Sequence, residues 1–483
     1  MIVHVLSMKA DAKENRWIIV VFWMAMVAFL GVCAYYMIHD AYWRIEDEAI
    51  VIAHTGMGKA FSPTGFDCMV ECYGRLYPFA YNLYNVLLLF HDGYISPTDH
   101  YILQSIALIV YALAFAAIAL FLLRKQPVGW KYATAFCFVA ICVARVYTEF
   151  ITCYTGMWIV FMFLPVFLWS ACKFNETEKW VYGAVSLLVI NYISYCYETV
   201  FVIPLAMGAC SLLLNYKNLS KNKRVFNWLF VLSGLLFLSL YAIIVLPRAS
   251  HFYRIHHDIS FLLINAFNIF LAQKIYWIAI VVLVWRMIEI VRKKSSYSFY
   301  DSMLLASFAY FIGAVVLGLD FTYYYNVGSL MALVPILQFL NEKLKPTWLI
   351  ILMACLAGYY CRKMPLTIKT FHKERTQTFA EVSNLSKYIG KEDVFWYTPE
   401  YEDSTNLWAD LRSTMRWRLE VYLSWLLHQD VHIEERMVFN ADEKGIWLFP
   451  SENKKLFPDD DAANKVQGSQ VFSVHDIYGC RVQ

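Results

Sequence analysis

The sequence predicts an all-α polytopic membrane protein that carries a small α/β domain outside the membrane. Of the 483 residues, 60% are hydrophobic and only 16% are charged, whereas soluble domains are nearer ~25% charged. The apolar residues gather in runs long enough to cross a bilayer, and the composition becomes that of a soluble domain after Arg362. The net charge of +3 is too balanced for a protein that binds nucleic acid by neutralising phosphates.

About eleven spans are expected, because a run of ~18 or more mostly apolar residues is long enough to be a candidate membrane helix. Several of the runs are short or contain proline. The expected spans are Trp17–Ile38, Tyr101–Leu123, Tyr132–Thr148, Trp158–Cys172, Val181–Tyr195, Val200–Leu214, Phe226–Leu246, Ile275–Ile290, Phe299–Leu319, Val327–Leu340 and Trp348–Tyr360.

The distribution of Lys and Arg over the connections predicts the orientation in the membrane. Basic residues are concentrated in one set of connections and are sparse in the other set, which places the N-terminus in the cytosol. With an odd number of spans, the chain after Tyr360 lies on the non-cytosolic side. We therefore predict a transmembrane domain over 1–365, with a large first outer loop over 40–100, and an extracytoplasmic domain over 366–483. The C-terminus carries no endoplasmic-reticulum retention signal, which favours a bacterial inner membrane.

The tail beyond the last span has three short segments with the residue pattern of β-strands. They are Asp393–Thr398, Gly445–Phe449 and Gln470–Val474. The segment Arg416–Leu427 reads equally well as a helix or a long strand. Together they predict a small α/β domain.

The first outer loop holds the strongest candidate for chemistry. Glu46, Asp47 and Glu48 follow the first span closely and are flanked by aromatic and apolar residues rather than by a polar run. Carboxylates at a membrane edge are costly unless they are solvated, paired or bound to a cation. A solvated loop is the plain alternative, but it leaves the apolar surroundings of the acids unexplained.

The position of these acids, together with the topology, resembles the GT-C superfamily of membrane glycosyltransferases. This superfamily includes the protein O-mannosyltransferases and the lipid A aminoarabinose transferases. At residue level the resemblance rests on Asp47-Glu48-Ala49 and, more loosely, on the stretch Gly74 to Tyr81. It implies a polyprenyl-phosphate-linked sugar donor and transfer with inversion, on the non-cytosolic face, to a glycan, lipid or protein acceptor.

This chemistry suggests a role for each acid. An inverting transfer needs one general base to take the acceptor proton, and the resemblance points to Asp47. Glu48 would orient Asp47 or help to hold a divalent cation, Mg²⁺ or Mn²⁺. Glu149, at the outer end of the third span, is a further candidate for substrate or metal contact. Its structural alternative is an i, i+4 ion pair with Arg145.

Basic and aromatic residues on the same side are candidates for binding the donor. Arg75 follows Gly74 in the return of the first loop, and Tyr324 lies in a run of three tyrosines before a late span. A membrane-edge loop adds cations and imidazoles that suit a lipid phosphate. Each of these has an alternative role: headgroup contact for Arg75, an interfacial aromatic belt for Tyr324, and a solvated interface for the loop. The loop candidates are Arg254, His256, His257 and Lys274.

Three other classes fit parts of the pattern. A transporter or flippase for lipid-linked or anionic solutes usually shows two matched halves with helices broken near the midplane, and the sequence has no such symmetry. An O-antigen polymerase or ligase typically carries its largest outer loop late in the chain, whereas the large loop here comes first. A non-catalytic membrane scaffold leaves the placement of the acids unexplained. The glycosyltransferase therefore ranks first.

Overall fold

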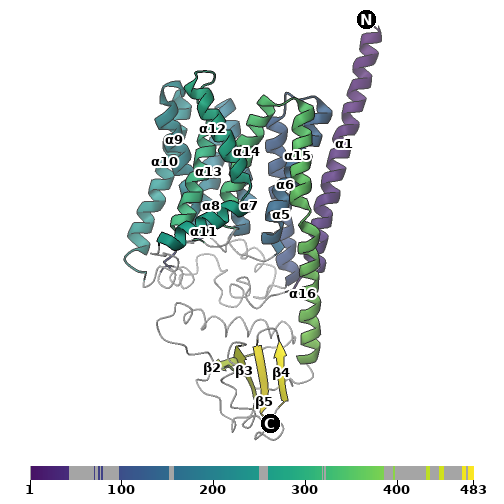
Figure 1. The fold of residues 1–483 in the computed structure, drawn as a ribbon, viewed down its shortest axis with the longest axis vertical. Helices are drawn as coiled ribbons and strands as arrows, with labels where there is room; N and C mark the ends of the chain where they lie inside the picture. The colour runs from purple at the N-terminus through teal and green to yellow at the C-terminus, as the bar shows by residue number, and fades with distance from the viewer. Residues whose placement is uncertain are drawn as a thin grey trace.

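The molecule is a bundle of long helices with a small β-sheet beyond one end (Figure 1). This computed structural model describes residues 2–42, 70, 74–76, 78–79, 97–151, 157–249, 259–317, 319, 323–385, 395–397, 431–435, 445–450, 470–474 and 477–482. The buried apolar residues of the bundle form one large core that extends through most of its helices. A mostly helical membrane fold is therefore confirmed.

The N-terminal part of the bundle packs around α5 (Pro97–Leu122). α1 (Ile2–His39), α6 (Val128–Ile151) and α7 (Met157–Thr177) all contact this helix. α1 lies on the outside and exposes Trp17 on its outer surface, as expected for a helix that faces lipid. α6 and α7 are mostly buried, and they bring their polar residues into the interior of the bundle.

The middle of the chain forms a closely packed group of helices. Gly208 explains part of this close packing, because a Cβ atom there would lie 2.5 Å from the backbone oxygen of Asn227 on the next long helix. The elements are α8 (Trp180–Cys196), η1 (Glu198–Phe201), α9 (Val202–Asn215), η2 (Tyr216–Asn218), α10 (Lys221–Leu240) and the π-helical turn η3 (Tyr241–Val245).

A sharp bend separates the next two helices. α11 (Ile259–Ala272) and α12 (Ile275–Val291) meet at 90°, and α11 lies across the end of the bundle nearest the sheet (Figure 1). Most side chains of α11 are exposed, including Phe267 and Ile264. An apolar helix that lies across the bundle end is typical of the membrane interface.

The last helices of the bundle differ greatly in burial. α13 (Phe299–Val316) begins with a capping box between Ser298 and Asp301. α14 (Asn326–Lys343) is buried along almost its whole length, whereas α15 (Pro346–Cys361) packs mainly on α6 and exposes its other side.

Helices occupy all eleven ranges in which spans are expected, but the count of eleven is not confirmed. In the part of the chain that the structure describes, eight helices are long and apolar enough to cross a membrane, or nine if α11 and α12 count as one bent span. α8 is a shorter apolar helix, and α14 ends in a charged stretch. The chain is therefore a multi-pass membrane protein with fewer clear spans than predicted.

α16 (Met364–Leu385) leads from the bundle to a five-stranded sheet. The strand order is β2-β1-β3-β5-β4, in which β1 pairs in parallel with β2 and β3, while β5 pairs antiparallel with β3 and β4. The strands are β1 (Phe395–Tyr397), β2 (Ile433–Glu435), β3 (Gly445–Pro450), β4 (Gln470–Val474) and β5 (Ile477–Val482).

Three of these strands lie in the segments predicted to be strands, whereas β2, β5 and the helix α16 were not expected. The segment Arg416–Leu427 lies outside the described residues, so the α/β character of the whole tail and the division at residues 365 and 366 remain predictions.

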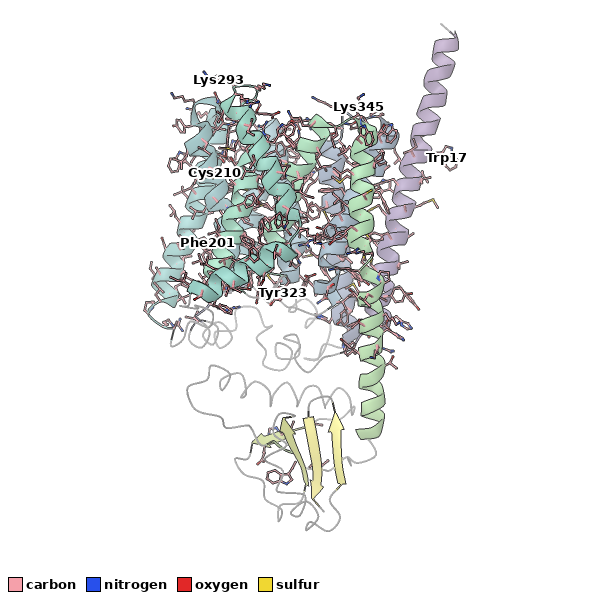
Figure 2. All side chains as sticks on the ribbon, viewed as in Figure 1. Trp17, Phe201, Cys210, Lys293, Tyr323 and Lys345 are labelled. Atoms are coloured by element: carbon pink, nitrogen blue, oxygen red, sulfur yellow. The ribbon has the colours of Figure 1, made fainter. Side chains whose placement is uncertain are left out.

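The two ends of the bundle carry different residues. Figure 2 shows Lys293 and Lys345 at the end where α1 begins, and Tyr323 at the opposite end, from which α16 runs to the sheet. We call these the basic end and the sheet end. The side of the membrane on which each end lies, and with it the cytosolic N-terminus, stays a prediction.

Candidate functional site

Polar side chains from three separate parts of the chain meet at the sheet end of the bundle, and all of them are buried except the half-buried Arg145. Arg145 and Glu149 come from the last turns of α6, Gln273 lies at the bend between α11 and α12, and Asn326 and Ser329 lie in the first turn of α14. We call these five residues the Arg145 cluster. Gln273, Asn326 and Ser329 are each at most 3% exposed.

The Arg145 guanidinium donates to three side chains of the cluster. Its Nη2 atom contacts Gln273 Oε1 and Asn326 Oδ1 and lies 3.1 Å from Ser329 Oγ. Gln273 Nε2 donates to the same Asn326 oxygen at 3.0 Å. These contacts connect the bend of α11 and α12 to both α6 and α14.

Asn326 links Arg145 to Glu149. Its Nδ2 atom donates to Glu149 Oε1 at 2.7 Å, while its Oδ1 atom accepts from Arg145. An amide offers a donor and an acceptor on two separate atoms of one short, uncharged side chain. Arg145 and Glu149 are four residues apart on α6, as an i, i+4 ion pair requires, yet the amide of another helix bridges them.

Tyr324 packs in the interior next to this cluster. It is 3% exposed, its ring stacks on Tyr197 with the centroids 5.4 Å apart, and Tyr310 donates a hydrogen bond to its backbone oxygen at 3.1 Å. A tyrosine this deeply packed does not belong to an exposed interfacial belt. The structure therefore places Tyr324 at the sheet end and leaves its binding role as a prediction.

Arg75 and Lys274 are the other two site candidates that the structure describes. Arg75 Nε lies 3.8 Å from Glu198 Oε1, which gives that acid a partner that the sequence did not reveal. Tyr241 holds the preceding residue by donating to the backbone oxygen of Gly74 at 2.8 Å. Lys274 follows Gln273 at the bend, and its Nζ atom lies 5.1 Å from the centroid of the Tyr359 ring.

The remaining candidates, Asp47, Glu48, Arg254, His256 and His257, lie outside the described residues. In the part of the chain that is described, no three His, Cys, Asp or Glu side chains are arranged to hold a metal ion. A cation site that includes Asp47 and Glu48 therefore stays a prediction.

The chain that leads into the first outer loop is held against α16. Asp40 is 1% exposed, and its Oδ1 atom lies 2.9 Å from His372 Nδ1. Two residues later, Tyr42 donates to Glu374 Oε2 at 2.6 Å. The chain is thus fixed to α16 at Tyr42, and Asp47 follows five residues later in the sequence.

Sequence reasoning singled out Glu149 as a site candidate, named Arg145 only as its possible ion-pair partner, and missed Gln273 and Asn326. Both amides lie beside apolar runs, where a single polar residue carries no pattern of its own. A usable signal was that Asn326 directly follows the three tyrosines and begins a nearly all-apolar helix, where a buried amide needs partners.

No protein-family model and no curated protein matches the chain. Solved structures do match it. The chain is similar to ArnT from Cupriavidus metallidurans bound to undecaprenyl phosphate, with a TM-score of 0.53 and 11% identity, over 95% of this chain and 98% of that one. It is also similar to ArnT from Cupriavidus metallidurans in the apo state, with a TM-score of 0.57 and 9% identity, over 98% of both chains.

These likenesses define the fold. They extend over nearly the whole chain, so the chain and ArnT share one overall fold. The resemblance that a short acidic motif and the topology first indicated is thus confirmed as a likeness of fold to ArnT.

Proposed function

We propose that this chain is an integral membrane glycosyltransferase that uses a polyprenyl-phosphate-linked sugar as donor. The observation that carries the proposal is the whole-chain similarity of fold to a structure with bound undecaprenyl phosphate. The sequence contributes independent support, because acids follow the first span and a long loop leads back to the membrane on the same side.

In this proposal the acceptor hydroxyl attacks the anomeric carbon on the non-cytosolic face. Asp47 takes the hydroxyl proton as general base, the new glycosidic bond forms, and the bond between sugar and phosphate breaks with inversion. The electron pair of that bond leaves on the polyprenyl phosphate, whose growing negative charge requires a fixed cation. The acceptor is a glycan, a lipid or a protein.

The Arg145 cluster supports a phosphate or sugar site at the sheet end. Its Arg145 is fixed by side chains from two other parts of the chain, so a charge here is already oriented before substrate binds. Glu149 is held at a set distance from that charge through Asn326. Arg75, Tyr324 and the loop residues Arg254, His256 and His257 are proposed donor contacts, and Glu48 with Asp47 and Glu149 would hold Mg²⁺ or Mn²⁺ where a cation is needed.

The test is donor consumption by purified protein. Wild type, Asp47→Asn and the neighbouring control Glu46→Gln are incubated with a panel of polyprenyl-phosphate sugars, with and without Mg²⁺ or Mn²⁺, and sugar loss is followed by mass spectrometry. We expect wild type to consume one donor, Asp47→Asn to be at least ~100-fold slower, and Glu46→Gln to stay near wild type.

Two outcomes would contradict parts of this proposal. No consumption of any donor by well-folded wild type, with or without cation and acceptor extracts, would reject the glycosyltransferase. Equal and small effects of Asp47→Asn and Glu46→Gln would keep the enzyme class and remove Asp47 as the base.

A further inference from the structure

Two exposed cations share one tyrosine ring near the Arg145 cluster. Lys274 Nζ lies 5.1 Å and Arg362 Cζ lies 4.3 Å from the centroid of Tyr359. Lys274 belongs to the bend between α11 and α12, whereas Arg362 ends α15. Two like charges brought to one ring from distant parts of the chain repel each other, so an anion bound beside them would stabilise the arrangement.

No acid neutralises these charges in the part of the chain that is described. Lys274, Arg362 and the adjacent Lys363 make no ion pair there, although all three are exposed. At the basic end of the bundle, by contrast, Arg286 and Lys343 both contact acids.

Lys293 and Lys345 at the basic end likewise make no ion pair among the described residues, so the missing acid alone does not distinguish the sheet end. The site at Tyr359 combines a shared ring with no described acid, whereas at Phe121, which Arg124 and Lys173 share, Arg124 pairs with Glu176.

The ring next to Tyr359 connects this surface to the interior. Tyr360 packs edge to face against Tyr359 with the centroids 5.2 Å apart, and the guanidinium of Arg145 lies 5.4 Å from the Tyr360 centroid. The exposed cations Lys274 and Arg362 are therefore connected to Arg145 through the adjacent rings of Tyr359 and Tyr360.

The surface around the exposed cations is apolar. Leu271 and Trp277 flank Lys274 in sequence and are 42% and 48% exposed, and Leu366, one turn after Arg362, is 67% exposed. A soluble anion does not need such surroundings, whereas a phosphate attached to a long hydrocarbon chain does.

We propose that Lys274, Arg362 and Tyr359 form a docking site where the phosphate of a polyprenyl-phosphate lipid binds as it passes between the bilayer and the Arg145 cluster. Passage of the lipid to the Arg145 cluster rests on the proposed function. Binding of the lipid to this docking site can be measured without turnover. Lys363 adds charge at the rim, and the exposed apolar residues contact the first isoprene units.

The test compares two double variants with the same change in charge. Lys274→Gln with Arg362→Gln removes the docking cations, and Lys293→Gln with Lys345→Gln removes two cations at the basic end (Figure 2). Binding of undecaprenyl phosphate is measured by native mass spectrometry from nanodiscs of neutral phosphatidylcholine. We expect the first variant to bind about 30-fold more weakly, since each cation near a lipid phosphate contributes about 1 kcal/mol, or about fivefold, and the second to bind like wild type.

Two further arms identify the ligand. Phosphatidylglycerol added in tenfold excess should not displace undecaprenyl phosphate, and inorganic phosphate should neither bind nor compete. The charge-conserving pair Lys274→Arg with Arg362→Lys should keep most of the binding, which separates loss of charge from loss of folding. Where donor turnover is measured, we expect the Gln pair to raise KM with little change in kcat.

Equal binding by both Gln pairs would overturn the docking site, and displacement by phosphatidylglycerol would replace it with a general anionic-lipid site. The two proposals fail separately. Wild type that binds the lipid through these cations yet consumes no donor would reject the enzyme and leave the docking site. If wild type consumed a donor but its lipid binding did not depend on Lys274 and Arg362, the enzyme would be supported and the docking site rejected.

Discussion

The two ends of the bundle place different partners beside their positive charges. At the basic end, Arg286 of α12 forms a bidentate pair with Asp301, with Nε to Oδ1 at 2.8 Å and Nη2 to Oδ2 at 2.9 Å. Glu289 joins the same network, since it accepts from Arg286 Nη1 at 3.2 Å and contacts Lys343. Each of these charges has an opposite charge beside it.

At the sheet end, amides and hydroxyls take the place of the acids. Arg145 donates to Gln273, Asn326 and Ser329, and Glu149 accepts from Asn326 rather than sitting at the centre of a closed ion-pair network. Loss of one member of an ion pair leaves the other charge unpaired and destabilises the fold, whereas a cation held by neutral groups keeps its full charge beside a ligand. We infer that the basic end is built for structure and the sheet end for chemistry.

The largest expected effect is on stability at the basic end. Asp301→Ala leaves the half-buried Arg286 without its main partner and removes the acid of the capping box, so the free energy of unfolding should fall by about 2–3 kcal/mol. Thermal and denaturant unfolding in detergent measure this. The apolar pair Arg286→Met with Asp301→Leu should recover much of the loss. A loss below about 1 kcal/mol for Asp301→Ala would show that the network is not structural.

The second effect concerns turnover at the sheet end. Arg145→Lys keeps the charge on a shorter side chain that ends before the position of Nη2, the atom that contacts all three acceptors, so we expect turnover to fall about 10- to 100-fold. The matched variant Arg286→Lys should leave the turnover of the folded protein unchanged while lowering its thermal stability. If both variants lowered turnover by the same factor, the distinction between the two ends would be wrong.

The spans could be predicted from sequence because the signal for each is local. A run of apolar residues long enough for the bilayer becomes a helix wherever it lies, and helices occupy every expected range. The bend at Gln273 and Lys274 could not be predicted, because no proline or glycine marks it and the apolar run continues on both sides. α16 carries many charges and therefore does not resemble a span.

The candidate site was predicted only in part, because its contacts are distant in sequence. Arg145 and Glu149 stand one turn apart and can be found together in the sequence. Their partners Gln273 and Asn326 lie more than a hundred residues further on, and only the packing of α6, α12 and α14 brings them together. The same is true of Arg362, which nothing in the sequence connects to Lys274.

The smallest effect tests whether every polar contact at the sheet end is functional. Tyr42 donates to Glu374 of α16 at 2.6 Å, and its ring packs on Phe371 with the centroids 4.9 Å apart. Tyr42→Phe keeps the ring and removes one hydrogen bond to a charged group, so it should cost about 1–2 kcal/mol of stability.

Tyr101→Phe is the matched control for this variant. Tyr101 donates to the backbone oxygen of Ile151 at 2.7 Å, and loss of this bond to a neutral group should cost about 0.5–1.5 kcal/mol. Thermal unfolding and donor turnover are measured for both variants, and neither should change the turnover of the folded protein more than about twofold, because both bonds hold backbone segments rather than a substrate. A much larger loss of turnover in Tyr42→Phe alone would mean that the contact with α16 sets the position of the loop that carries Asp47. The functional region would then extend beyond the Arg145 cluster to the helix that leads to the sheet.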